Sequence, residues 1–382
     1  MKNILLLGAT GSIGDSVLSV ISQNKESLNL IGISFNKNIL KSKKILKEFS
    51  PEYVFIDDFD SYKSLVTKNS ERYLNGDDNL EKLINIEEID IIVCATSGFA
   101  GLKAAYIAAK TGKKILLANK ESIVAGGDLI LPLAKENNSE IIPIDSEHNA
   151  IFQCLSGEKG TEDVKSITIT ASGGPFINAS IKELQHVTVE DALNHPNWKM
   201  GSKVTIDSAT LINKCLELIE ARYLFDLDEK YFDLVIHPQS IIHSIVTYID
   251  GSSICQMSSP DMRVPIAHAL SEENRIPIDF KDLDFSNLNL SFQGFPSDRS
   301  KIQDIAREVC NKGGFLGTVF NASNEIAVES FLNKKINFNE IYEVIYRTFD
   351  KNIVSNEVTI ESINEVDAQT RIHAQKVVKS FA

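Results

Sequence analysis

The chain has 382 residues, which at roughly 150 residues per domain predicts two or three domains and excludes a small stapled scaffold. Charged residues make up 24% and hydrophobic residues 43%, values typical of globular proteins rather than of disordered chains. Thirty-nine Lys and Arg against 52 Asp and Glu leave a net charge of −13, which disfavours nucleic acid and anionic membranes as partners. A small anionic substrate would therefore need a local pocket of hydrogen-bond donors.

The five cysteines are scattered along the chain and are never spaced as CxxC. We expect reduced, buried thiols rather than disulfides or a thiolate metal site. No apolar run approaches the roughly 20 residues needed to cross a bilayer, so we expect no membrane partner. The first residues, Met1-Lys2-Asn3, lead directly into a strand-like run. We expect no signal or transit peptide and a cytoplasmic location.

Residues 1–145 alternate short aliphatic runs with helical stretches, a pattern typical of βαβ units. This pattern predicts an α/β fold whose amino-terminal domain is doubly wound and Rossmann-like, with a largely parallel sheet. The strands of this domain are predicted at 4–7, 28–33, 53–56, 89–94, 114–117 and 140–144.

Residues 146–271 are predicted to form a second domain of mixed α/β structure. Asp250-Gly251 lies between two strand-like runs and favours a tight hairpin. The predicted elements of this domain are a strand at 166–170, a long apolar helix at 208–225, and strands at 244–249 and 253–257.

The last part of the chain changes character twice. Residues 272–300 lack clear periodicity and contain two prolines and a glycine, so we interpret them as a linker. Helical periodicity returns in residues 301–382 and predicts a carboxy-terminal helical bundle. Its helices are predicted at 302–311, 316–333 and 338–349.

A glycine-rich turn, Gly8-Ala9-Thr10-Gly11-Ser12-Ile13-Gly14, follows the first predicted strand and opens a helix. Backbone N–H groups and a helix amino terminus in this context can bind a pyrophosphate, which predicts a dinucleotide cofactor. A glycine turn that only packs helix on strand is the alternative. After the second strand, Ser34-Phe35-Asn36-Lys37-Asn38 offers hydroxyl, amide and ammonium groups but no carboxylate, which favours NADP over NAD.

Two carboxylates follow the last strand predicted for the first domain, in Asp145-Ser146-Glu147. Ligands of open α/β folds bind at the carboxyl ends of the strands. In extended backbone, residues two apart point the same way, so Asp145 and Glu147 are expected to converge. Their hard oxygen donors suit Mg²⁺ or Mn²⁺. A solvated acidic turn is the alternative reading.

The predicted helix at 208–225 is apolar on most of its surface and carries one polar stripe. Buried charge is costly unless it is paired or bound to a metal, so we interpret the stripe as the wall of a site, with a solvated face as the alternative. Ser208, near the start of this helix, can cap it or present a hydroxyl to an anion. The stripe consists of Thr210, Asn213, Lys214, Glu217 and Glu220.

Two further segments offer contacts to a phosphorylated substrate. Ser172-Gly173-Gly174 ends a predicted strand with a hydroxyl and exposed backbone, although a simple turn explains it equally well. His195 and Trp198 lie in a loop where an aromatic ring could act as a lid, with loop packing as the alternative. The remaining singled-out histidines, His148, His237, His243 and His268, are expected to be core or surface residues.

Together these stretches resemble the 1-deoxy-D-xylulose 5-phosphate reductoisomerase family. They span the first two predicted domains in the family's order, and the remaining length suits its linker and helical tail. The long block that starts at His195 is highly specific, whereas the glycine motif is not. The matching motifs are GATGSIG at Gly8, LANKES at Leu117, PIDSEHNAIFQ at Pro143, ASGGPF at Ala171, HPNWKMGSKVTIDSATLINKCLE at His195, HPQSIIHS at His237 and PDMRVPIAHAL at Pro260.

The resemblance implies an NADPH-dependent, homodimeric enzyme of the non-mevalonate isoprenoid pathway. Such an enzyme uses a divalent cation, Mg²⁺ or Mn²⁺, to rearrange a small sugar phosphate, 1-deoxy-D-xylulose 5-phosphate. It then reduces the branched aldehyde to 2-C-methyl-D-erythritol 4-phosphate.

The resemblance also implies roles for individual residues at the matching positions. Asp145, Glu147 and Glu217 are expected to bind the metal and, with Lys120 and His195, to be catalytic. Substrate contacts are implied for Ser146, Glu147, Ser172, His195, Trp198, Ser208, Asn213, Lys214 and Glu217, with Met200 joining Trp198 in the lid. Cofactor contacts are implied for Thr10, Gly11, Ser12, Ile13, Asn36, Lys37, Asn38, Asn119, Lys120, Glu121 and Gly201. Asn36 departs from the family, which commonly has glycine before Lys-Asn.

Two other functions stay open at this point. The first is a different NADP oxidoreductase, similar to the aspartate-semialdehyde dehydrogenases, but these need an activated cysteine and Cys154 and Cys215 lie in apolar helical contexts. The second is a nucleotide sensor or scaffold without catalysis. A protein of that kind would be expected to lose the three carboxylates of the predicted metal site, which this chain retains.

Overall fold

A computed structural model describes residues 1–66, 72–158, 160–198, 200–271, 274–349 and 357–381. Residues 272 and 273 of the predicted linker lie outside this range. The chain forms two compact units that interleave along the sequence. The first contains Met1–Asn119, Ile130–Asp145 and Met262–Phe280, and the second contains Lys120–Leu129, Ser146–Asp261 and Lys281–Ala382.

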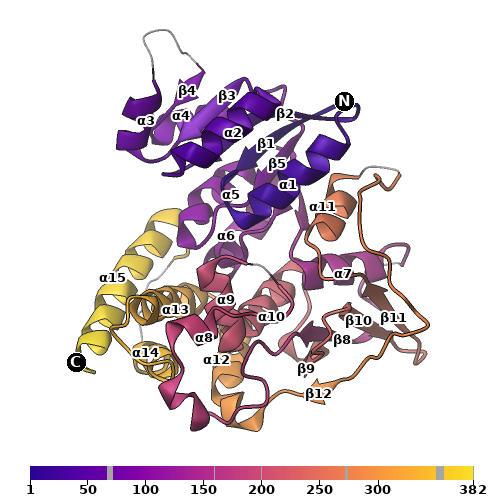
Figure 1. Cartoon of the computed structure of the whole chain (residues 1–382), viewed down its shortest axis with the longest axis vertical. Coiled ribbons are helices and arrows are strands. Elements are labelled where there is room, and N and C mark those ends of the chain that lie inside the picture. Colours follow the sequence, from indigo (N-terminus) through magenta and orange to yellow (C-terminus); the bar gives the residue numbers. More distant parts are fainter. Residues whose placement is uncertain (67–71, 159, 199, 272–273, 350–356, 382) are drawn as a thin grey trace. The chain divides into compact units, whose positions relative to one another are not determined.

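The first unit is built on a seven-stranded parallel sheet with the order β4-β3-β2-β1-β5-β6-β7. The order reverses between β1 and β5, and open α/β folds bind ligands at such a point. The central strands are buried because helices cover the sheet (Figure 1). The strands are β1 (Lys2–Leu7), β2 (Leu28–Phe35), β3 (Tyr53–Ile56), β4 (Tyr73–Leu74), β5 (Ile91–Cys94), β6 (Lys114–Leu117) and β7 (Glu140–Pro143).

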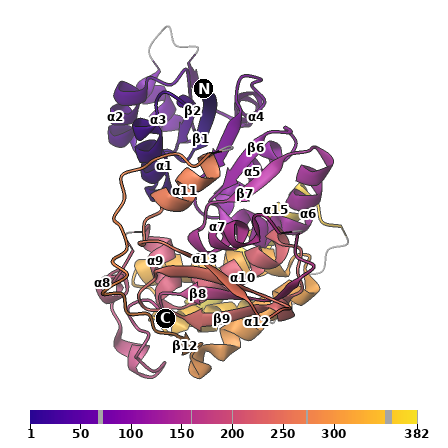
Figure 2. The same cartoon turned by 90° about the vertical axis from the view of Figure 1, so that its right-hand side faces the viewer.

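Helices lie between most consecutive strands of the first unit along the chain, because parallel strands need crossover connections. One helix from later in the chain, α11 (Arg263–Leu270), packs beside α1 (Figures 1 and 2). The others are α1 (Ser12–Gln23), α2 (Ile39–Phe49), α3 (Phe59–Leu65), α4 (Asp77–Ile84), η1 (Phe99–Gly101) and α5 (Leu102–Ala108). Helix α6 (Lys120–Glu136) is kinked at Gly126, and its residues divide between the two units.

The second unit contains a mixed five-stranded sheet with the order β11-β10-β8-β9-β12. Among the described strands of this sheet, only β8 and β9 pair in parallel, and Gly251, at φ +88°, forms the hairpin between β10 and β11 as predicted. Figure 2 shows β8, β9 and β12 side by side. The strands are β8 (Val164–Ala171), β9 (Phe232–Ile236), β10 (Ile242–Tyr248), β11 (Ser253–Met257) and β12 (Gln293–Gly294).

Helices α7 and α10 pack on this sheet, and α13, α14 and α15 pack together beside it (Figure 1). In the part of the chain that the structure describes, no helix is both long and apolar enough to cross a membrane. The helices are α7 (Ser146–Leu155), η2 (Glu183–His186), α8 (Val189–Ala192), α9 (Ser202–Ala209), α10 (Ile212–Leu224), η3 (Glu229–Tyr231), η4 (Ser297–Arg299), α12 (Ser300–Lys312), α13 (Leu316–Leu332), α14 (Glu340–Phe349) and α15 (Ile360–Lys379).

Three expectations from the sequence are wrong in detail. The helix predicted at 208–225 is two helices, because Leu211 adopts a left-handed conformation, φ +62°, between α9 and α10. Asp145 and Glu147 do not lie on extended backbone, since α7 begins at Ser146. Of the five cysteines, which are all free, Cys255 is exposed because it lies on the edge strand β11.

The predicted division into domains at 145, 271 and 300 stays an interpretation of the sequence. In the structure, the carboxy-terminal helices belong to the same compact unit as the mixed sheet. Segment 272–300 contributes the short strand β12 to that sheet and the 3₁₀ helix η4.

Candidate active site

The glycine-rich turn is held tightly at the carboxyl end of β1. A Cβ atom on Gly8, whose φ is +89°, would lie 2.6 Å from the carbonyl oxygen of Ala95, which follows β5. A Cβ atom on Gly14 would lie 2.5 Å from the carbonyl oxygen of Ala9. The Ser34 hydroxyl accepts the N–H of Gly8 at 2.9 Å. Only glycine therefore fits at both positions. The backbone of the turn is held in one conformation between the ends of β1, β2 and β5.

The start of α1 can receive an anion. Gly11 is its N-cap residue and provides no side-chain hydrogen bond to the first turn, which contains Ser12 and Ile13. Backbone N–H groups at such a start are unsatisfied within the helix and attract phosphate oxygens. Lys41 in α2 supports the turn, because its ammonium donates to the carbonyl of Thr10 at 2.9 Å.

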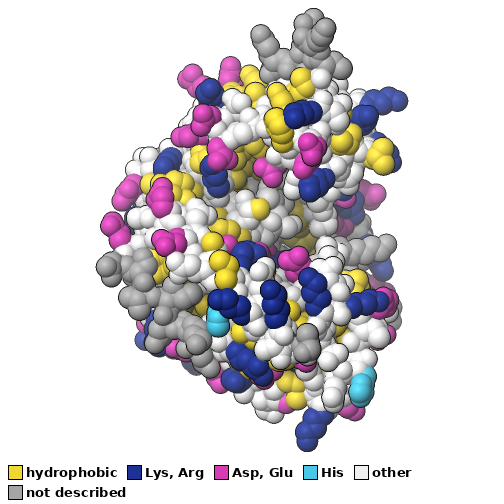
Figure 3. All heavy atoms as spheres, turned by 90° about the vertical axis from the view of Figure 1, so that its left-hand side faces the viewer, with side chains coloured by type: hydrophobic (Ala, Val, Ile, Leu, Met, Phe, Trp, Pro, Cys, Tyr) yellow, Lys and Arg dark blue, Asp and Glu magenta, His cyan; other side chains and the backbone are white. Residues whose placement is uncertain are grey.

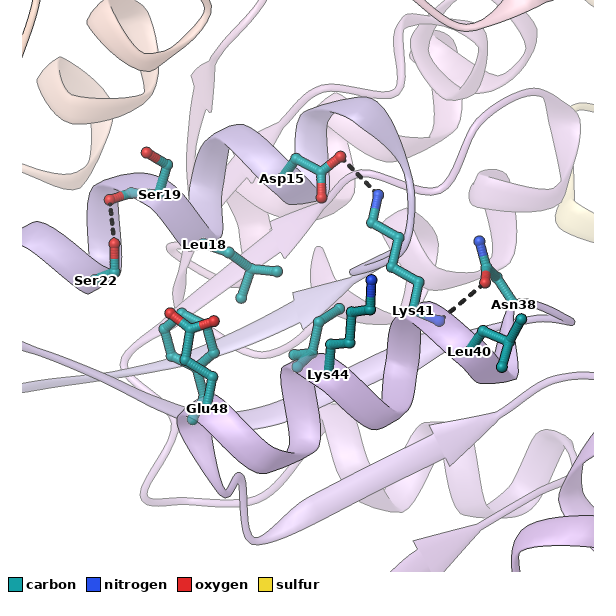
Figure 4. A pocket seen from close by; sticks show the side chains of 11 residues that line it. Asp15, Leu18, Ser19, Ser22, Asn38, Leu40, Lys41, Lys44 and Glu48 are labelled. Atoms are coloured by element: carbon teal, nitrogen blue, oxygen red, sulfur yellow. Dashed lines mark hydrogen bonds and ion pairs between the residues drawn. The ribbon is translucent and has the colours of Figure 1, made fainter.

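Lys41 also pairs with Asp15 at 2.6 Å, across a groove of about 640 Å³ between α1 and α2 (Figure 4). The sequence reasoning did not single out Lys41. Its partners on the turn and in α1 are 26 to 31 residues away, and no local pattern signals such a contact.

The segment after β2 presents a cation near the same end of the sheet. Lys37 is exposed, with its ammonium 3.8 Å from Asp58, and Asn36 is exposed beside it. Asn38 caps α2 by accepting the N–H of Lys41 at 3.1 Å. Asn119, also in the first unit, is buried and donates to the carbonyl of Gly98. The other residues expected to contact the cofactor, Lys120, Glu121 and Gly201, belong to the second unit.

Three carboxylates converge where α7 begins. One carboxylate oxygen from each of Asp145, Glu147 and Glu217 lies within 4.8 Å of the others. Asp145 directly precedes α7, Glu147 is in its first turn, and Glu217 projects from α10. The Ser146 hydroxyl donates to Glu147. Three hard oxygen donors at this spacing suit Mg²⁺ or Mn²⁺. The structure thus brings together the three carboxylates that were expected to bind the metal, and their role as ligands stays a prediction.

A second group of potential ligands lies next to this cluster. His148 and Glu220 form it together with Asp145, and the imidazole Nδ1 is 2.9 Å from the Glu220 carboxylate. His148 Nε2 contacts the backbone carbonyl of Glu217 at 2.9 Å. Glu220, the last member of the predicted polar stripe, therefore pairs with a buried histidine.

Two buried lysines contact the carboxylates. The Lys120 ammonium donates to Asn213 Oδ1 and to Glu217 Oε1, each at 3.0 Å. The Lys214 ammonium donates to Glu147 Oε1 at 2.8 Å and to the other oxygen of Glu217. Burial disfavours the charged form of Lys214, but Glu147 and Glu217 outweigh it and raise the pKa of this lysine. The ammonium group is therefore charged at neutral pH.

The predicted polar stripe is confirmed at Asn213, Lys214 and Glu217, which lie on one side of α10 and contact one another. Thr210 does not join them. It precedes α10, and its hydroxyl donates to the carbonyls of Ile206 and Asp207. The break at Leu211 explains this difference, because it ends the helical register that the sequence pattern assumed.

Ser172, His195 and Ser208 form a second polar cluster. His195 Nε2 lies 3.1 Å from both serine hydroxyls. His195 Nδ1 accepts the N–H groups of Asn197 at 3.2 Å and Trp198 at 3.0 Å. Burial lowers the pKa of His195, so the ring is neutral at pH 7. Because Nδ1 is an acceptor, the proton is on Nε2 and points toward the serines.

The approach of Ser172 to Ser208 depends on the glycines that follow β8. Gly173 and Gly174 have φ values of +84° and +65°. A Cβ atom on Gly174 would lie 2.8 Å from the carbonyl oxygen of Ser208 in α9. Without a side chain at Gly174, the end of β8 can lie directly against α9. Two hydroxyls and an imidazole N–H are thereby gathered in a cluster that can bind phosphate oxygens.

Trp198 belongs to the loop between α8 and α9, and its ring packs edge-on against His243 with centroids 6.1 Å apart. Asn197 anchors the same loop by donating to the carbonyl of Pro238 at 2.6 Å. Met200 is half-buried. The loop is thus in contact with the β9–β10 connection and, through His195, with the serine cluster.

A buried ionic network at the start of α6 was also missed. The Lys203 ammonium lies 3.1 Å from Glu121 and 2.7 Å from Asp207, and Asn324 of α13 donates to Asp207 at 2.8 Å. Burial disfavours the charged form of Lys203, but the two carboxylates raise its pKa far above the usual range. The network fixes α9, which carries Ser208, against α6 and α13. Only the spacing of Lys203 and Asp207, four residues apart, could have been found in the sequence.

Comparison with known proteins identifies relatives of this chain. Residues 4–127 match the family described as 1-deoxy-D-xylulose 5-phosphate reductoisomerase. Residues 141–225 match its C-terminal domain, and residues 257–373 match a further DXP reductoisomerase C-terminal domain. The 1-deoxy-D-xylulose 5-phosphate reductoisomerase of Clostridium botulinum (strain Loch Maree / Type A3) is 44% identical over 382 residues, covering 98% of this chain and 99% of the relative. That of Clostridium perfringens (strain 13 / Type A) is 45% identical over 380 residues, covering 97% and 98%.

Solved structures show the same similarity. A crystal structure of DOX-P reductoisomerase in complex with NADPH, fosmidomycin and magnesium has a TM-score of 0.92 at 38% identity, covering 99% of this chain and 98% of that chain. The Zymomonas mobilis 1-deoxy-D-xylulose 5-phosphate reductoisomerase in complex with NADPH has a TM-score of 0.91 at 38% identity, covering 99% of each chain.

Proposed function

Because the chain belongs to the 1-deoxy-D-xylulose 5-phosphate reductoisomerase family, we propose that its carboxylate, lysine and serine clusters together form the active site. The enzyme converts 1-deoxy-D-xylulose 5-phosphate to 2-C-methyl-D-erythritol 4-phosphate by rearrangement and reduction, with NADPH and a divalent cation. The observation that carries the assignment of residues is the convergence of Asp145, Glu147 and Glu217 around two buried lysines.

A divalent cation would be held by Asp145, Glu147 and Glu217. These residues fit the ion, because one oxygen from each of three carboxylates lies within 4.8 Å of the others, and hard oxygen donors are the ligands that Mg²⁺ prefers. The bound ion supplies Lewis acidity toward the ketone and the adjacent hydroxyl of the substrate, which eases breaking and remaking of the carbon skeleton. Mg²⁺ and Mn²⁺ both suit these donors.

Lys120 is assigned to the substrate oxygen that gains negative charge during the reaction. Its ammonium is buried beside Glu217 and Asn213, so it is fixed in position before substrate arrives. A preorganised donor in a dry site stabilises developing charge more than water does. Ser146 and Glu147 are assigned to substrate hydroxyls at the start of α7.

The substrate phosphate is assigned to Ser172, Ser208 and His195, together with Asn213 and Lys214. The hydroxyls and the His195 Nε2–H donate to phosphate oxygens, and the Lys214 ammonium supplies charge. These groups are remote from the carbons that rearrange, so their binding energy can orient the substrate and close the loop that bears Trp198 and Met200. That loop is assigned the role of a lid.

NADPH is assigned to the glycine-rich turn. The backbone from Thr10 to Ile13 would bind the pyrophosphate, since a side chain at Gly8 is excluded and the start of α1 carries no side-chain cap. The exposed Lys37, with Asn36 and Asn38, would bind the 2′-phosphate. Bound NADPH supplies the hydride. Contacts to the rest of the cofactor are assigned to Asn119, Lys120, Glu121 and Gly201.

We also propose that the enzyme is a cytoplasmic homodimer. Strand β11 is an edge of the mixed sheet and exposes Ile254, and Ile249, at the end of the hairpin that β11 forms with β10, is also exposed. An exposed edge with apolar side chains is suited to pairing with a second copy. The free thiols support a reducing compartment. Sedimentation velocity should show a dimer, and a monomer at micromolar concentration would refute the proposed homodimer.

Substituting Glu217→Gln tests the metal assignment, because the amide keeps the shape of the side chain but removes its negative charge. Mg²⁺ affinity, measured by calorimetry without substrate, should fall at least about tenfold, or ~1.4 kcal/mol. The matched control Glu162→Gln changes an exposed carboxylate of the same unit and should leave the affinity unchanged. Equal Mg²⁺ affinity in Glu217→Gln and wild type would remove Glu217 from the metal site.

A further inference from the structure

Arg299 is among the largest fully buried side chains of the described residues, at 1% exposure. It ends η4, directly before α12. Its Nη2 group donates to the carbonyl oxygens of Phe176 at 2.9 Å and Ala179 at 2.8 Å. Its Nε and Nη1 groups have no hydrogen-bond partner among the described residues. Burying a charged guanidinium with two unpaired nitrogens costs free energy, so its two hydrogen bonds to one loop indicate a specific role for Arg299.

Neighbouring side chains hold the same loop. The Asp298 carboxylate accepts the N–H of Ile181 at 2.8 Å. Asn339 donates to the carbonyl of Ile181 at 2.7 Å. The Phe176 ring packs edge-on against Phe338, with centroids 5.3 Å apart. Residues 176–181 are therefore anchored to η4 and to the connection between α13 and α14.

The anchored residues continue directly from the serine cluster. Only Gly173, Gly174 and Pro175 separate Ser172 from Phe176. Both glycines have positive φ, and glycine has more backbone freedom than any other residue. The direction of Ser172 is therefore set on one side by β8 and by the packing of Gly174 against α9, and on the other side by what holds the loop beyond Pro175.

We propose that Arg299 is a positioning residue for phosphate binding: it fixes residues 176–179 so that the Ser172 hydroxyl faces His195 and Ser208. This inference rests on the proposed phosphate role of Ser172, His195 and Ser208. Charge-assisted hydrogen bonds to two carbonyls are stronger than neutral ones and set the geometry of the loop. Arg299 touches neither substrate nor cofactor in this account. Its loss should weaken phosphate binding and leave the chemical steps largely intact.

Arg307 provides a matched control. It lies in α12 of the same unit, pairs with Glu229, and donates to the carbonyl of Phe232 at 3.1 Å. Its contacts are on η3 and the start of β9, away from residues 172–181. Arg307→Met therefore removes a partly exposed, carboxylate-paired guanidinium and one backbone bond without touching the loop, and so controls for the loss of an arginine from α12.

Trp198 gives a readout that does not depend on activity. It is the only tryptophan of the chain, and its backbone N–H donates to the same imidazole that contacts both serines. Inorganic phosphate is the probe, titrated into the full-length protein with Mg²⁺ while tryptophan fluorescence is recorded. Steady-state kinetics with 1-deoxy-D-xylulose 5-phosphate separates KM from kcat.

Arg299→Met should raise the phosphate Kd and the KM for the sugar phosphate by about tenfold or more, with kcat changed less than about threefold. Arg299→Lys should restore part of the affinity, because an ammonium can donate to the same carbonyls. Arg307→Met should stay within about twofold of wild type in Kd and KM, whatever it costs in stability.

A folded Arg299→Met protein with the phosphate Kd and KM of Arg307→Met would overturn the proposal. Should Arg299→Met fail to fold, Asp298→Ala decides, since Asp298 is exposed and holds the same loop. An unchanged phosphate Kd in Asp298→Ala would then refute the anchor. Ser208→Ala tests the premise separately: wild-type phosphate affinity in that variant would refute the phosphate site itself, and the inference with it.

Discussion

Lys214 has two possible sets of partners, and its role depends on which it contacts. In the structure its ammonium pairs with Glu147 and Glu217, the residues assigned to the metal. A divalent cation would take over the charge of these carboxylates and leave the ammonium available to a phosphate. Metal and phosphate should therefore bind with positive coupling, and by linkage each should raise the affinity for the other by the same factor.

Phosphate titrations with Mg²⁺ and with EDTA measure this coupling. In wild type, Mg²⁺ should lower the phosphate Kd by about tenfold, corresponding to ~1.4 kcal/mol. In Lys214→Met the factor should fall to about threefold or less, because only the direct attraction between the ions remains. Lys165→Met, an exposed lysine in β8, serves as the control and should keep the wild-type factor. The same factor in Lys214→Met and wild type would disprove the role of Lys214 in the coupling.

The residues of the site were predictable to different degrees. Asn213, Lys214 and Glu217 could be identified because helical periodicity places them on one side of α10. Asp145 and Glu147 converge for a different reason from the predicted one, as α7 begins between them. Lys120, Lys41 and Arg299 contact partners 26 to 123 residues away, and a single sequence holds no local pattern for such contacts.

At the scale of elements, the site depends on how closely β8 ends against α9. Gly174→Ala should disturb this contact, because its Cβ would lie 2.8 Å from the Ser208 carbonyl oxygen. Gly251→Ala is the matched control, since it also has positive φ but no atom within 4 Å of a Cβ. Both should lose about 1–2 kcal/mol of unfolding free energy from backbone strain, measured in urea. Only Gly174→Ala should also raise the KM for the sugar phosphate, by about tenfold.

A Gly174→Ala variant with wild-type KM would show that the close approach of β8 to α9 does not matter for substrate binding. A raised KM in Gly251→Ala would show that the kinetic effect comes from general loss of stability.

Most strands of the first unit follow from the sequence, because buried parallel strands appear as continuous aliphatic runs. The two-residue strands β4 and β12 have too few residues to show a pattern. No sequence pattern indicated the break between α9 and α10, because leucine rarely adopts a positive φ and tertiary packing imposes this conformation on Leu211. The same break separates Ser208 from the polar side of α10.

At the scale of the whole molecule, the net charge and the protonation of titratable groups determine how stability depends on pH. The net charge is −13, yet Figure 3 shows one face on which several Lys and Arg side chains gather, while acidic and basic side chains are mixed elsewhere on it. His268 in α11 is a titrating group whose effect on stability can be isolated. Burial, with further contributions from Arg275 and Lys114, lowers the pKa of His268 from its ordinary 6.5 to about 4.

Because the folded pKa of His268 is below the unfolded value, the unfolded state binds the proton first as the pH falls. Protonation of His268 in the unfolded state therefore lowers the free energy of unfolding as the pH falls from about 6.5 to about 4. Between pH 7.5 and pH 4.5, the Tm of the His268→Asn variant should fall less than the Tm of the wild type. His186→Asn removes an exposed imidazole and is the control. An equal fall of Tm in His268→Asn and wild type would contradict the neutral state of the half-buried His268.

A single chain of this enzyme provides both the metal-dependent rearrangement and the NADPH-dependent reduction. The most direct test follows NADPH absorbance at constant enzyme while 1-deoxy-D-xylulose 5-phosphate is added with Mg²⁺ or with EDTA. We predict oxidation of NADPH only when sugar phosphate and metal are both present, with 2-C-methyl-D-erythritol 4-phosphate as the product. A folded protein that binds NADPH but does not oxidise it under these conditions would refute the reductoisomerase activity, and equal oxidation in EDTA would refute the need for the metal.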